Sequence, residues 1–307
     1  MTELTRPALR WHGGKWLLAP WIISHFPEHR IYVEPFGGAA SVLLRKPRTY
    51  AEVYNDLDDV VVNLFRVLRD PEKAERLIAG LHLTPFSRVE FDEALEDAED
   101  DVERARHLIV RSFMGFGSNA HSGSEVAKKT GFRTHTRADV YRSTGFRSNS
   151  NRSGTTPAAD WRNYPEALAA IVDRWRGVVI EQRPAIEVIA QHDGIETLHY
   201  VDPPYLPETR SPANKYDLKH RMYRHELSRD DHAELLEKLK ALKGMVILSG
   251  YPSTLYDEQL GGLGLGFSER LMRTARGRGS NACGSTKPRR RGWRTGRRRC
   301  GWGRHLQ

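Results

Sequence analysis

The chain has 307 residues, of which 39% are hydrophobic, enough for one large domain with its own core. No apolar run approaches the ~20 residues of a transmembrane helix, and two cysteines, Cys283 and Cys300, are too few for a disulfide framework or a four-thiolate metal site. The N-terminus lacks a basic-then-apolar signal pattern, so the expected location is the cytoplasm.

The net charge of +9 is unevenly distributed. From Arg270 to Gln307 the chain has thirteen Arg or Lys and no acid, which leaves 35 basic and 39 acidic residues in the rest. The body is therefore mildly acidic, and the overall charge does not by itself indicate a DNA-binding protein.

Short apolar runs alternate with amphipathic stretches, which predicts an α/β fold: a mostly parallel sheet with helices on both faces. The predicted strands are Ile31–Glu34, Ala51–Tyr54, Val178–Glu181, Leu198–Val201 and Met245–Leu248. The predicted helices are Lys15–His25, Ala39–Leu44, Leu57–Leu68, Tyr164–Trp175, Ala185–Ala190 and Arg229–Leu242. Ser228 is the expected N-cap of the last helix, with Asp230 and Asp231 in its first turn.

The alternation stops between Pro71 and Trp161. An acidic helical stretch, Val89 to Met114, precedes a segment rich in Gly, Ser, Asn, Thr and Arg that is longer than the loops of most compact domains. We interpret residues 71–161 as an insertion in a core made of residues 1–70 and 162–260.

The composition changes abruptly in residues 261–307, where acids vanish, both cysteines appear and no strand-like alternation survives. Three interpretations are open: a DNA-binding arm, a disordered basic tail, or a frameshift near Gly261. We favour the frameshift, because out-of-frame GC-rich codons yield Arg, Gly, Cys, Trp and Pro.

The stretch YVEPFGGAAS, residues 32–41, contains a strand, an acid, a glycine turn and a helix start. Gly37 and Gly38 allow a ligand to approach the backbone at the carboxyl edge of the sheet, where α/β folds bind nucleotides. The stretch is not the dinucleotide motif G-x-G-x-x-G. Asp56, after the next strand, is placed to accept hydrogen bonds from ribose hydroxyls. The glycine turn alone or Asp56 alone is more typical of a tight turn or a helix N-cap, but the two together favour an adenosine-containing ligand.

The N-terminal stretch RPALRWHGGKW offers two groups that suit a ligand with purine and carboxylate ends. Trp11 provides a stacking face and Lys15 a positive charge. A strap that packs its tryptophans on the core is an equally good interpretation. Arg10 suits contact with guanine or phosphate, although a plain surface arginine fits the pattern as well.

The tetrapeptide Asp202-Pro203-Pro204-Tyr205 ends a predicted core strand that its prolines cannot continue. The Asp202 carboxylate and a nearby backbone carbonyl suit a planar amine, since both accept hydrogen bonds from it. Tyr205 suits stacking on the attached ring. Two such hydrogen bonds direct the lone pair of the amine toward an electrophile.

The order WHGGK (11–15), EPFGG (34–38), an insertion and DPPY (202–205) resembles the Dam-type (D12 class) adenine-specific DNA methyltransferases. The stretch from Met222 to Ser253 is also similar to phage and prophage members of that family. The resemblance covers most of residues 6–257.

The resemblance implies a Rossmann-like sheet that binds S-adenosyl-L-methionine, and direct methyl transfer to N6 of adenine without a covalent intermediate. The target adenine must leave the duplex to reach such a site, which leaves Tyr205 to replace its lost stacking. We expect a monomer that acts on double-stranded DNA.

The resemblance also implies the roles of individual residues. The catalytic residues are Asp202, Pro203, Pro204 and Tyr205. The cofactor contacts are Trp11, Lys15, Glu34, Phe36, Gly37, Gly38, Asp56 and Asp202. No metal ligands are expected. Ala39 and Ala40 stand where many members have further glycine, which should affect loop flexibility more than chemistry.

The insertion is the predicted target-recognition region. From Ser112 to Asn163 it has eight Arg or Lys against three acids, and TGFR occurs twice. The repeat places a phenylalanine beside Arg133 and beside Arg147, which suits phosphate contact plus stacking on bases. A solvated loop with a coincidental repeat is the alternative. The DNA-binding candidates are Arg10, Arg133 and Arg147.

Two alternatives to an adenine methyltransferase stay open at this point. A cytosine-N4 methyltransferase handles the same kind of amine, although Ser-Pro-Pro-Tyr is commoner there. A DNA-binding protein without turnover is the other, if the tail is out of frame.

Overall fold

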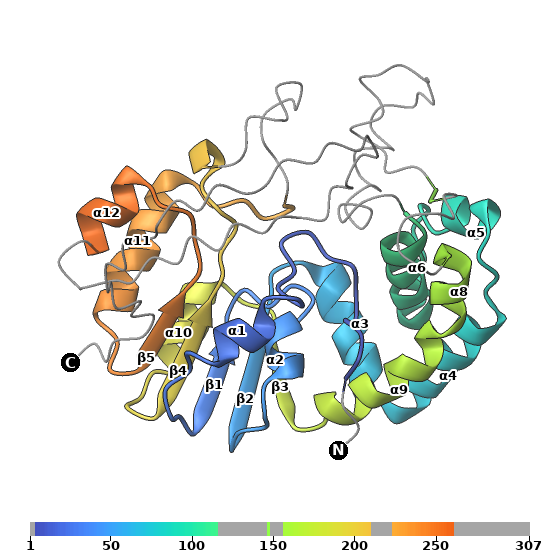
Figure 1. Ribbon diagram of the computed structural model, residues 1–307, viewed down its shortest axis with the longest axis horizontal. Coiled ribbons are helices and arrows are strands. Elements are labelled where there is room, and N and C mark those ends of the chain that lie inside the picture. Colours follow the sequence, from blue (N-terminus) through green and yellow to red (C-terminus); the bar gives the residue numbers. More distant parts are fainter. Residues whose placement is uncertain (1–3, 116–145, 148–155, 210–222, 261–307) are drawn as a thin grey trace, which may run out of the picture.

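The computed structural model describes residues 4–115, 146–147, 156–209 and 223–260. Its centre is a five-stranded sheet in the order β3-β2-β1-β4-β5, in which every pair of neighbours is parallel (Figure 1). The strands are β1 (Ile31–Glu34), β2 (Ala51–Asn55), β3 (Val178–Glu181), β4 (Thr197–Val201) and β5 (Met245–Leu248). The predicted strands and the α/β fold class are confirmed.

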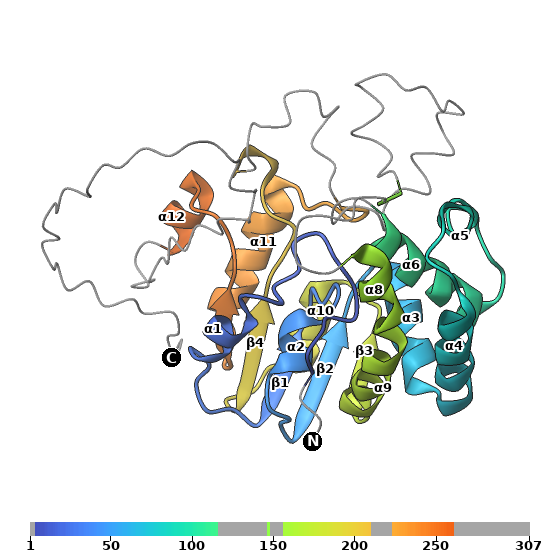
Figure 2. The same cartoon turned by 45° about the vertical axis from the view of Figure 1, so that its right-hand side comes forward.

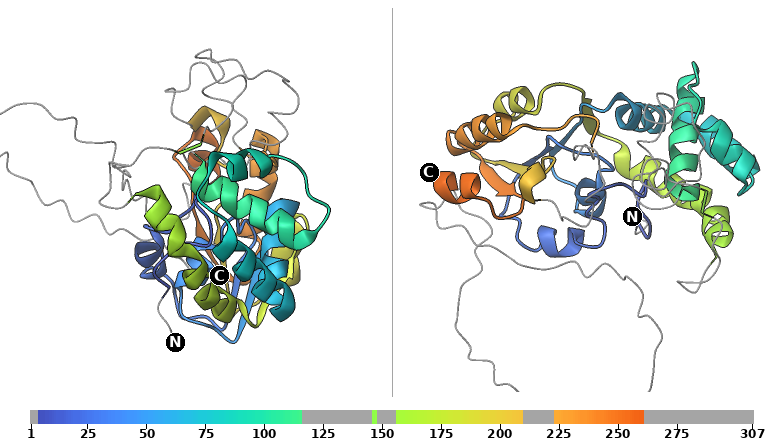
Figure 3. Two further views of the ribbon diagram at one scale, coloured as in Figure 1. Left: turned by 90° about the vertical axis from the view of Figure 1, so that its right-hand side faces the viewer. Right: turned by 90° about the horizontal axis from the view of Figure 1, so that it is seen from above.

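Helices cover both faces of the sheet because successive strand residues point to opposite sides. Tyr32 and Tyr54 belong to a large core cluster with residues of α2 (Ser41–Arg45), α3 (Asp59–Arg69) and α9 (Tyr164–Trp175). On the other face, Val33 and Val53 pack against Val188 of α10 (Ala185–Gln191). Seen from above, α10 and α11 (Arg229–Lys240) lie across the sheet from α1 (Ala19–Ile23) and α2 (Figure 3).

The strand order reverses at β1, which lies between β2 and β4. The chain leaves β1 toward one edge of the sheet and leaves β4 toward the other. In open α/β sheets, the crevice outside the carboxyl ends of strands at such a switch point is where ligands bind. The two motifs that follow β1 and β4 are therefore brought to the same place.

Several helices gather beyond β3, at one end of the sheet (Figures 1 and 2). These are α4 (Pro71–Leu83), α5 (Arg88–Glu93), α6 (Asp101–Met114), α8 (Pro157–Arg162) and α9. Leu77 of α4 and Leu108 of α6 belong to the same hydrophobic cluster as Tyr54 of the sheet. The helices of the predicted insertion thus share a core with the sheet, and its boundaries at residues 71 and 161 stay a prediction.

Two helix predictions differ from the structure by more than two residues at an end, while the other predicted helices agree with it to within two residues. The first helix starts at Ala19 rather than Lys15, because Pro20 has no amide proton and fits only the first turn of a helix. The predicted helical stretch between 89 and 114 is two helices, since Asp100 interrupts it and caps α6, accepting a hydrogen bond from the Glu103 amide at 2.9 Å.

The start of α11 is as predicted. Ser228 Oγ accepts a hydrogen bond from the Asp231 amide at 3.1 Å, and the Asp231 carboxylate accepts one from the Ser228 amide at 2.7 Å. This reciprocal capping box satisfies two of the amides that a helix start leaves unpaired. The short helix α12 (Thr254–Leu260) ends the described chain.

Across the described ranges, no helix combines the length and apolarity that a bilayer span requires. The basic tail of residues 261–307 and the DNA-binding candidate Arg133 lie outside the described residues.

Candidate active site

A cavity of about 460 Å³ opens at the carboxyl ends of β1, β2 and β4. This volume is in the range of small-molecule sites. Among its lining residues are ten of the predicted site residues: Trp11, Lys15, Glu34, Phe36, Gly37, Gly38, Asp56, Asp202, Pro203 and Pro204. The structure therefore brings together the segment before α1, the two strand-end loops and the Asp202–Tyr205 loop, here called the DPPY loop.

The glycine turn after β1 is packed too closely for side chains. A Cβ on Gly37 would lie 2.1 Å from Cε2 of the buried Tyr54 ring. Gly38 has a φ of 46°, and a Cβ there would lie 2.8 Å from Nε1 of Trp11. Ala40 also adopts a left-handed φ, 52°, a conformation that costs a non-glycine residue about 1–2 kcal/mol. Tight packing, rather than dinucleotide binding alone, explains both glycines.

Asp56 joins the two strand-end loops. One carboxylate oxygen accepts a hydrogen bond from the Gly38 amide at 2.7 Å, and the other accepts one from the Asp58 amide at 2.9 Å. Burial raises the pKa of Asp56 to about 6, against these hydrogen bonds, which lower it. The carboxylate thus lies fixed at the cavity wall, with lone pairs left to accept further hydrogen bonds.

Lys15 and Asp202 form a buried ion pair across the cavity. Nζ of Lys15 lies 2.6 Å from Oδ2 of Asp202, and the two side chains are 9% and 14% exposed. Nζ also donates to the Gly13 carbonyl at 2.8 Å. Burial lowers the pKa of Lys15, but Asp202 and Tyr205 outweigh it and raise this pKa above its usual value.

Tyr205 lies at the end of the DPPY loop, with its hydroxyl held by two groups. The hydroxyl donates to Oδ1 of Asp202 at 3.2 Å and lies 2.9 Å from Oγ of Ser249, which follows β5. Burial raises the pKa of the Tyr205 phenol to about 12. Its ring lies 5.1 Å from Nζ of Lys15 and meets the half-exposed Tyr251 ring edge-on at 4.9 Å. Ser249 and Tyr251 are site residues that the sequence analysis missed.

Glu34, at the end of β1, is almost fully buried. It accepts hydrogen bonds from the Tyr32 hydroxyl at 2.8 Å and from the Leu43 amide at 3.0 Å. Burial raises the pKa of Glu34 to about 8. Its contacts hold α2 against the end of β1.

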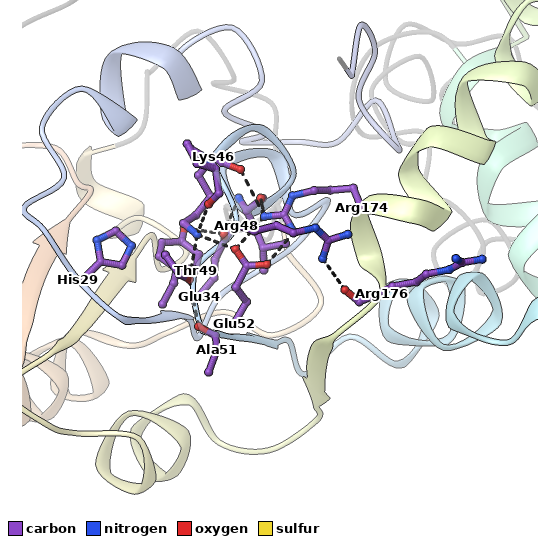
Figure 4. A network of polar contacts seen from close by, with 12 residues as sticks. His29, Glu34, Lys46, Arg48, Thr49, Ala51, Glu52, Arg174 and Arg176 are labelled. Carbon is purple, nitrogen blue, oxygen red and sulfur yellow. Dashed lines mark hydrogen bonds and ion pairs between the residues drawn. The ribbon is translucent and has the colours of Figure 1, made fainter. Parts of the chain in front are cut away.

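A second buried network secures the other end of α2 (Figure 4). Glu52 of β2 accepts hydrogen bonds from Lys46 Nζ at 2.6 Å and from Arg174 Nη1 at 2.7 Å. Arg174, from α9, also donates to the Leu43 carbonyl at 2.6 Å. The helix that follows the glycine turn is thus tied to the helix that leads back from the predicted insertion.

Residues 223–227 form a wall of the cavity that the sequence analysis did not assign. The Tyr223 ring packs edge-on to His12 at 5.2 Å, and its hydroxyl is so close to Gly13 that a Cβ there would lie 2.7 Å from it. Arg224 reaches across to the start of α3, with Nη1 2.8 Å from Asp59 Oδ1 and 3.3 Å from Asp58 Oδ1. The sequence signal was present, since an aromatic and a basic residue, Tyr223 and Arg224, stand a few residues before the Ser228 cap of α11.

Comparison with known protein families decides what this arrangement is for. A model of the D12 class N6 adenine-specific DNA methyltransferases matches residues 11–258, most of the chain. The chain belongs to this family. A search of curated protein sequences gave no match. The match ends just before the change of composition at residue 261.

The protein is accordingly an adenine-specific DNA methyltransferase that uses S-adenosyl-L-methionine as methyl donor. Of the two amine acceptors considered from the sequence, adenine is confirmed and the cytosine-N4 alternative is not supported. The expectation of a Rossmann-like methyltransferase sheet is confirmed as well.

The lining of the methyltransferase cavity is rich in acids, which suits the positively charged sulfonium of S-adenosyl-L-methionine. Five acidic residues line it: Glu34, Asp56, Asp58, Asp202 and Glu226. The pKa of Glu34 is raised to about 8, so this side chain is neutral at pH 7, and Lys15 and Arg224 pair with Asp202 and Asp58. Trp11 and the tight glycine turn add apolar and backbone surfaces. No group of three His, Cys, Asp or Glu in the described part of the chain could hold a metal ion. The acidic and apolar lining of the cavity fits S-adenosyl-L-methionine.

Arg10 and Arg147, the DNA-binding candidates among the described residues, are not lining residues of the cavity. Oγ of Ser112, in α6, accepts a hydrogen bond from the Arg10 amide at 2.7 Å and donates to the Arg10 carbonyl at 3.0 Å. The Arg147 amide donates to the carbonyl of Met114 at 2.7 Å. Burial, followed by the positive charge of Arg147, lowers the pKa of Arg10.

The first copy of the predicted Phe-Arg repeat, Phe132-Arg133, lies outside the described residues. In the second copy, Phe146-Arg147, the phenylalanine differs from the prediction that it stacks on bases. Phe146 is packed against Phe86 at 5.1 Å and Phe91 at 6.1 Å, with Arg88 over its ring. The ring is therefore an apolar anchor on the helices rather than a group presented to bases. Arg147, the other described residue of this copy, is partly exposed.

Proposed function

We propose that the cavity at the carboxyl ends of β1, β2 and β4 binds S-adenosyl-L-methionine and that the DPPY loop presents the target adenine to it. The observation that carries the proposal is the placement of the glycine turn and the DPPY loop on one cavity. The Lys15–Asp202 ion pair adds the segment before α1 to this site. The conclusion is an adenine-N6 methyltransferase that acts on specific sites in duplex DNA.

The proposed cofactor contacts follow from the lining. Asp56 is placed to accept hydrogen bonds from the ribose hydroxyls, and Trp11 to pack on the adenosine or the methionine chain. Lys15 is placed to pair its ammonium with the methionine carboxylate of the cofactor. Further lining residues of the cofactor cavity are Glu34, Phe36, Gly37 and Gly38. The bound cofactor supplies an electrophilic methyl group on its sulfonium.

The proposed chemistry on the protein side is orientation of one amine. A carboxylate has about four lone-pair positions, so Asp202 can accept a hydrogen bond from N6 while it keeps its contacts to Lys15 and Tyr205. A backbone carbonyl of the loop accepts the second N–H. The lone pair then points away from both acceptors, and the amine releases its proton after methylation. No strong base is required.

The target adenine has to leave the helix, because the DPPY loop cannot reach N6 inside a base-paired stack. Tyr205 is the proposed stacking partner for the extruded base. Stacking on an aromatic side chain is worth about 1–3 kcal/mol per base, so loss of the Tyr205 ring should reduce turnover less than loss of Asp202.

Residues 71–161 are the proposed target-recognition region, with Arg10 on the core side. Arg10 is partly exposed and carries a guanidinium group, which suits contact with phosphate or guanine. Arg133 and Arg147 complete the proposed set. The action of a monomer, the cytoplasmic location and a prophage-like origin are further parts of this proposal; similarity of residues 222–253 to phage members supports the last.

The experiment is expression of the full chain in a host that lacks adenine methylation, followed by nucleoside mass spectrometry and methylation-sensitive restriction of the host DNA. We expect N6-methyladenine at a defined site, and calorimetry of the purified protein should show S-adenosyl-L-methionine binding. Random methylation would contradict site specificity. Cofactor binding without methylation would indicate a protein that binds but does not turn over.

A further inference from the structure

His232 of α11 is fully buried behind the DPPY loop and contacts it directly. Its Nε2 lies 3.0 Å from the carbonyl oxygen of Pro204, and its Nδ1 lies 3.0 Å from the hydroxyl of Tyr256 in α12. The imidazole therefore bridges the catalytic loop and a second helix.

The chemistry of the two partners assigns the ring protons. A carbonyl oxygen only accepts, so the hydrogen bond to Pro204 requires a proton on Nε2. In the neutral ring Nδ1 is then an acceptor, and the Tyr256 hydroxyl donates to it. The direction of the chain is thus fixed: Tyr256 donates to His232, and His232 donates to the loop.

Few backbone groups of the DPPY loop can form hydrogen bonds to the surrounding protein. Pro203 and Pro204 carry no N–H, so neither can donate a hydrogen bond to the surrounding protein. On one side, Asp202 and Tyr205 are held by Lys15 and Ser249. His232 supplies a donor from α11, to a carbonyl in the middle of the loop.

We propose that His232 is a positioning residue for methyl transfer: its Nε2–H holds the Pro204 carbonyl and thereby sets where the DPPY loop presents the amine acceptors. Tyr256 fixes the tautomer and the orientation of the ring. This inference rests on the proposed function, since it takes the loop to be the grip on the target amine.

A positioning role predicts a specific kinetic pattern. A displacement of about 1 Å at reacting groups can cost on the order of a hundredfold in rate. His232 is not a lining residue of the cofactor cavity. Loss of the His232 side chain should therefore lower kcat and leave the cofactor affinity almost unchanged. A substitution that only destabilises the helix would instead lower the melting temperature, with kcat and cofactor affinity nearly normal in the folded protein.

The experiment compares four variants of the full chain. His232→Leu removes the donor, His232→Gln keeps a donor at a similar reach, and Tyr256→Phe removes the hydroxyl that orients the ring. The control is Leu168→Ala, which leaves a cavity at a fully buried position of α9, a helix that packs on α3 and α4 rather than on the DPPY loop. Each variant is assayed at a temperature at which circular dichroism shows it folded.

We expect kcat of His232→Leu to fall by about a hundredfold, with the Kd for S-adenosyl-L-methionine within about twofold of wild type by calorimetry. His232→Gln should recover about tenfold of this loss, and kcat of Tyr256→Phe should fall between those of wild type and His232→Leu. Leu168→Ala should be less stable with nearly normal kcat. A folded His232→Leu variant with near-normal kcat would overturn the proposal, as would equal losses in the Leu and Gln variants.

A spectroscopic readout separates this inference from the proposed function. If the wild-type chain transfers no methyl group, the ¹⁵N chemical shifts of the His232 ring still test the bridge. A protonated Nε2 and an unprotonated Nδ1 that changes shift in Tyr256→Phe support the assignment. A protonated Nδ1 with a bare Nε2 overturns it.

Discussion

Nζ of Lys15 and Oδ2 of Asp202 are 2.6 Å apart, and this ion pair joins the segment before α1 to the loop after β4. Both side chains are largely buried, at 9% and 14% exposure. Each charge therefore depends on the other for stability, and removal of one partner has consequences beyond catalysis.

Replacement of Asp202 should abolish methyl transfer and also destabilise the protein. Asp202→Ala leaves the buried Lys15 ammonium without its carboxylate, and breaking a buried pair in this way costs about 3–5 kcal/mol. The double variant Lys15→Met with Asp202→Ala should recover most of the stability, because no charge is left unpaired, and stay inactive. Urea unfolding and tritiated methyl transfer measure the two effects. Near-normal turnover of Asp202→Ala would exclude the proposed role.

Replacement of Gly37 should disrupt the cofactor site for a steric reason. A Cβ at this position collides with the ring of Tyr54, which is itself packed against Phe65 and Trp175. We expect Gly37→Ala to lose S-adenosyl-L-methionine binding in calorimetry and to melt at a lower temperature. The matched control is Gly80→Ala in α4, where the nearest side-chain atom is at 3.8 Å; it should gain about 0.5–1 kcal/mol. Normal cofactor binding by Gly37→Ala would contradict the packing described here.

Replacement of Arg147 should weaken DNA binding in a salt-dependent manner. If Arg147 contacts a phosphate, Arg147→Ala should reduce the slope of log affinity against log salt by about 0.9. The affinity for S-adenosyl-L-methionine should not change, since Arg147 is not a lining residue of the cavity. Arg176→Ala is the control: this exposed arginine lies between α9 and the amino end of β3 and is not a lining residue of the cavity. Equal slopes for Arg147→Ala and wild type would contradict a phosphate contact and favour the alternative that the segment around Arg147 is a solvated loop.

Replacement of His199 should stabilise the protein at acidic pH. His199 is fully buried in the middle of β4, and neither ring nitrogen has a hydrogen-bond partner among the described residues. Burial lowers the pKa of His199 from 6.5 to about 4. The unfolded chain therefore binds more protons between these values, so stability is complete above pH 6.5 and is lost as the pH falls toward 4, by an amount on the order of 3 kcal/mol.

His199→Leu should flatten this pH dependence and raise the free energy of unfolding at pH 5, because an apolar side chain of similar size has no group to protonate. Chemical unfolding at pH 5 and pH 7 measures the effect. His82→Leu, at an exposed position near the end of α4, is the control and should leave the profile unchanged. A profile for His199→Leu that matches wild type would show that His199 finds partners in solution.

The sequence by itself determined the features that depend on neighbours along the chain. Short apolar runs bounded by turns gave the five strands, and Ser228 gave the start of α11, because strand burial and helix capping act over a few residues. The motifs after β1 and β4 could be assigned to one site in advance, since parallel strands end at the same edge of a sheet.

Only the tertiary structure decided which side chains meet. The pairing of Lys15 with Asp202, the bridge from His232 to Pro204, and the wall of residues 223–227 join segments far apart in the chain. Phe146 packs on the helices, although its local pattern suited DNA equally well. Such contacts depend on how whole elements pack, and a pattern of a few residues specifies the position of a side chain on its own element but not what lies opposite it.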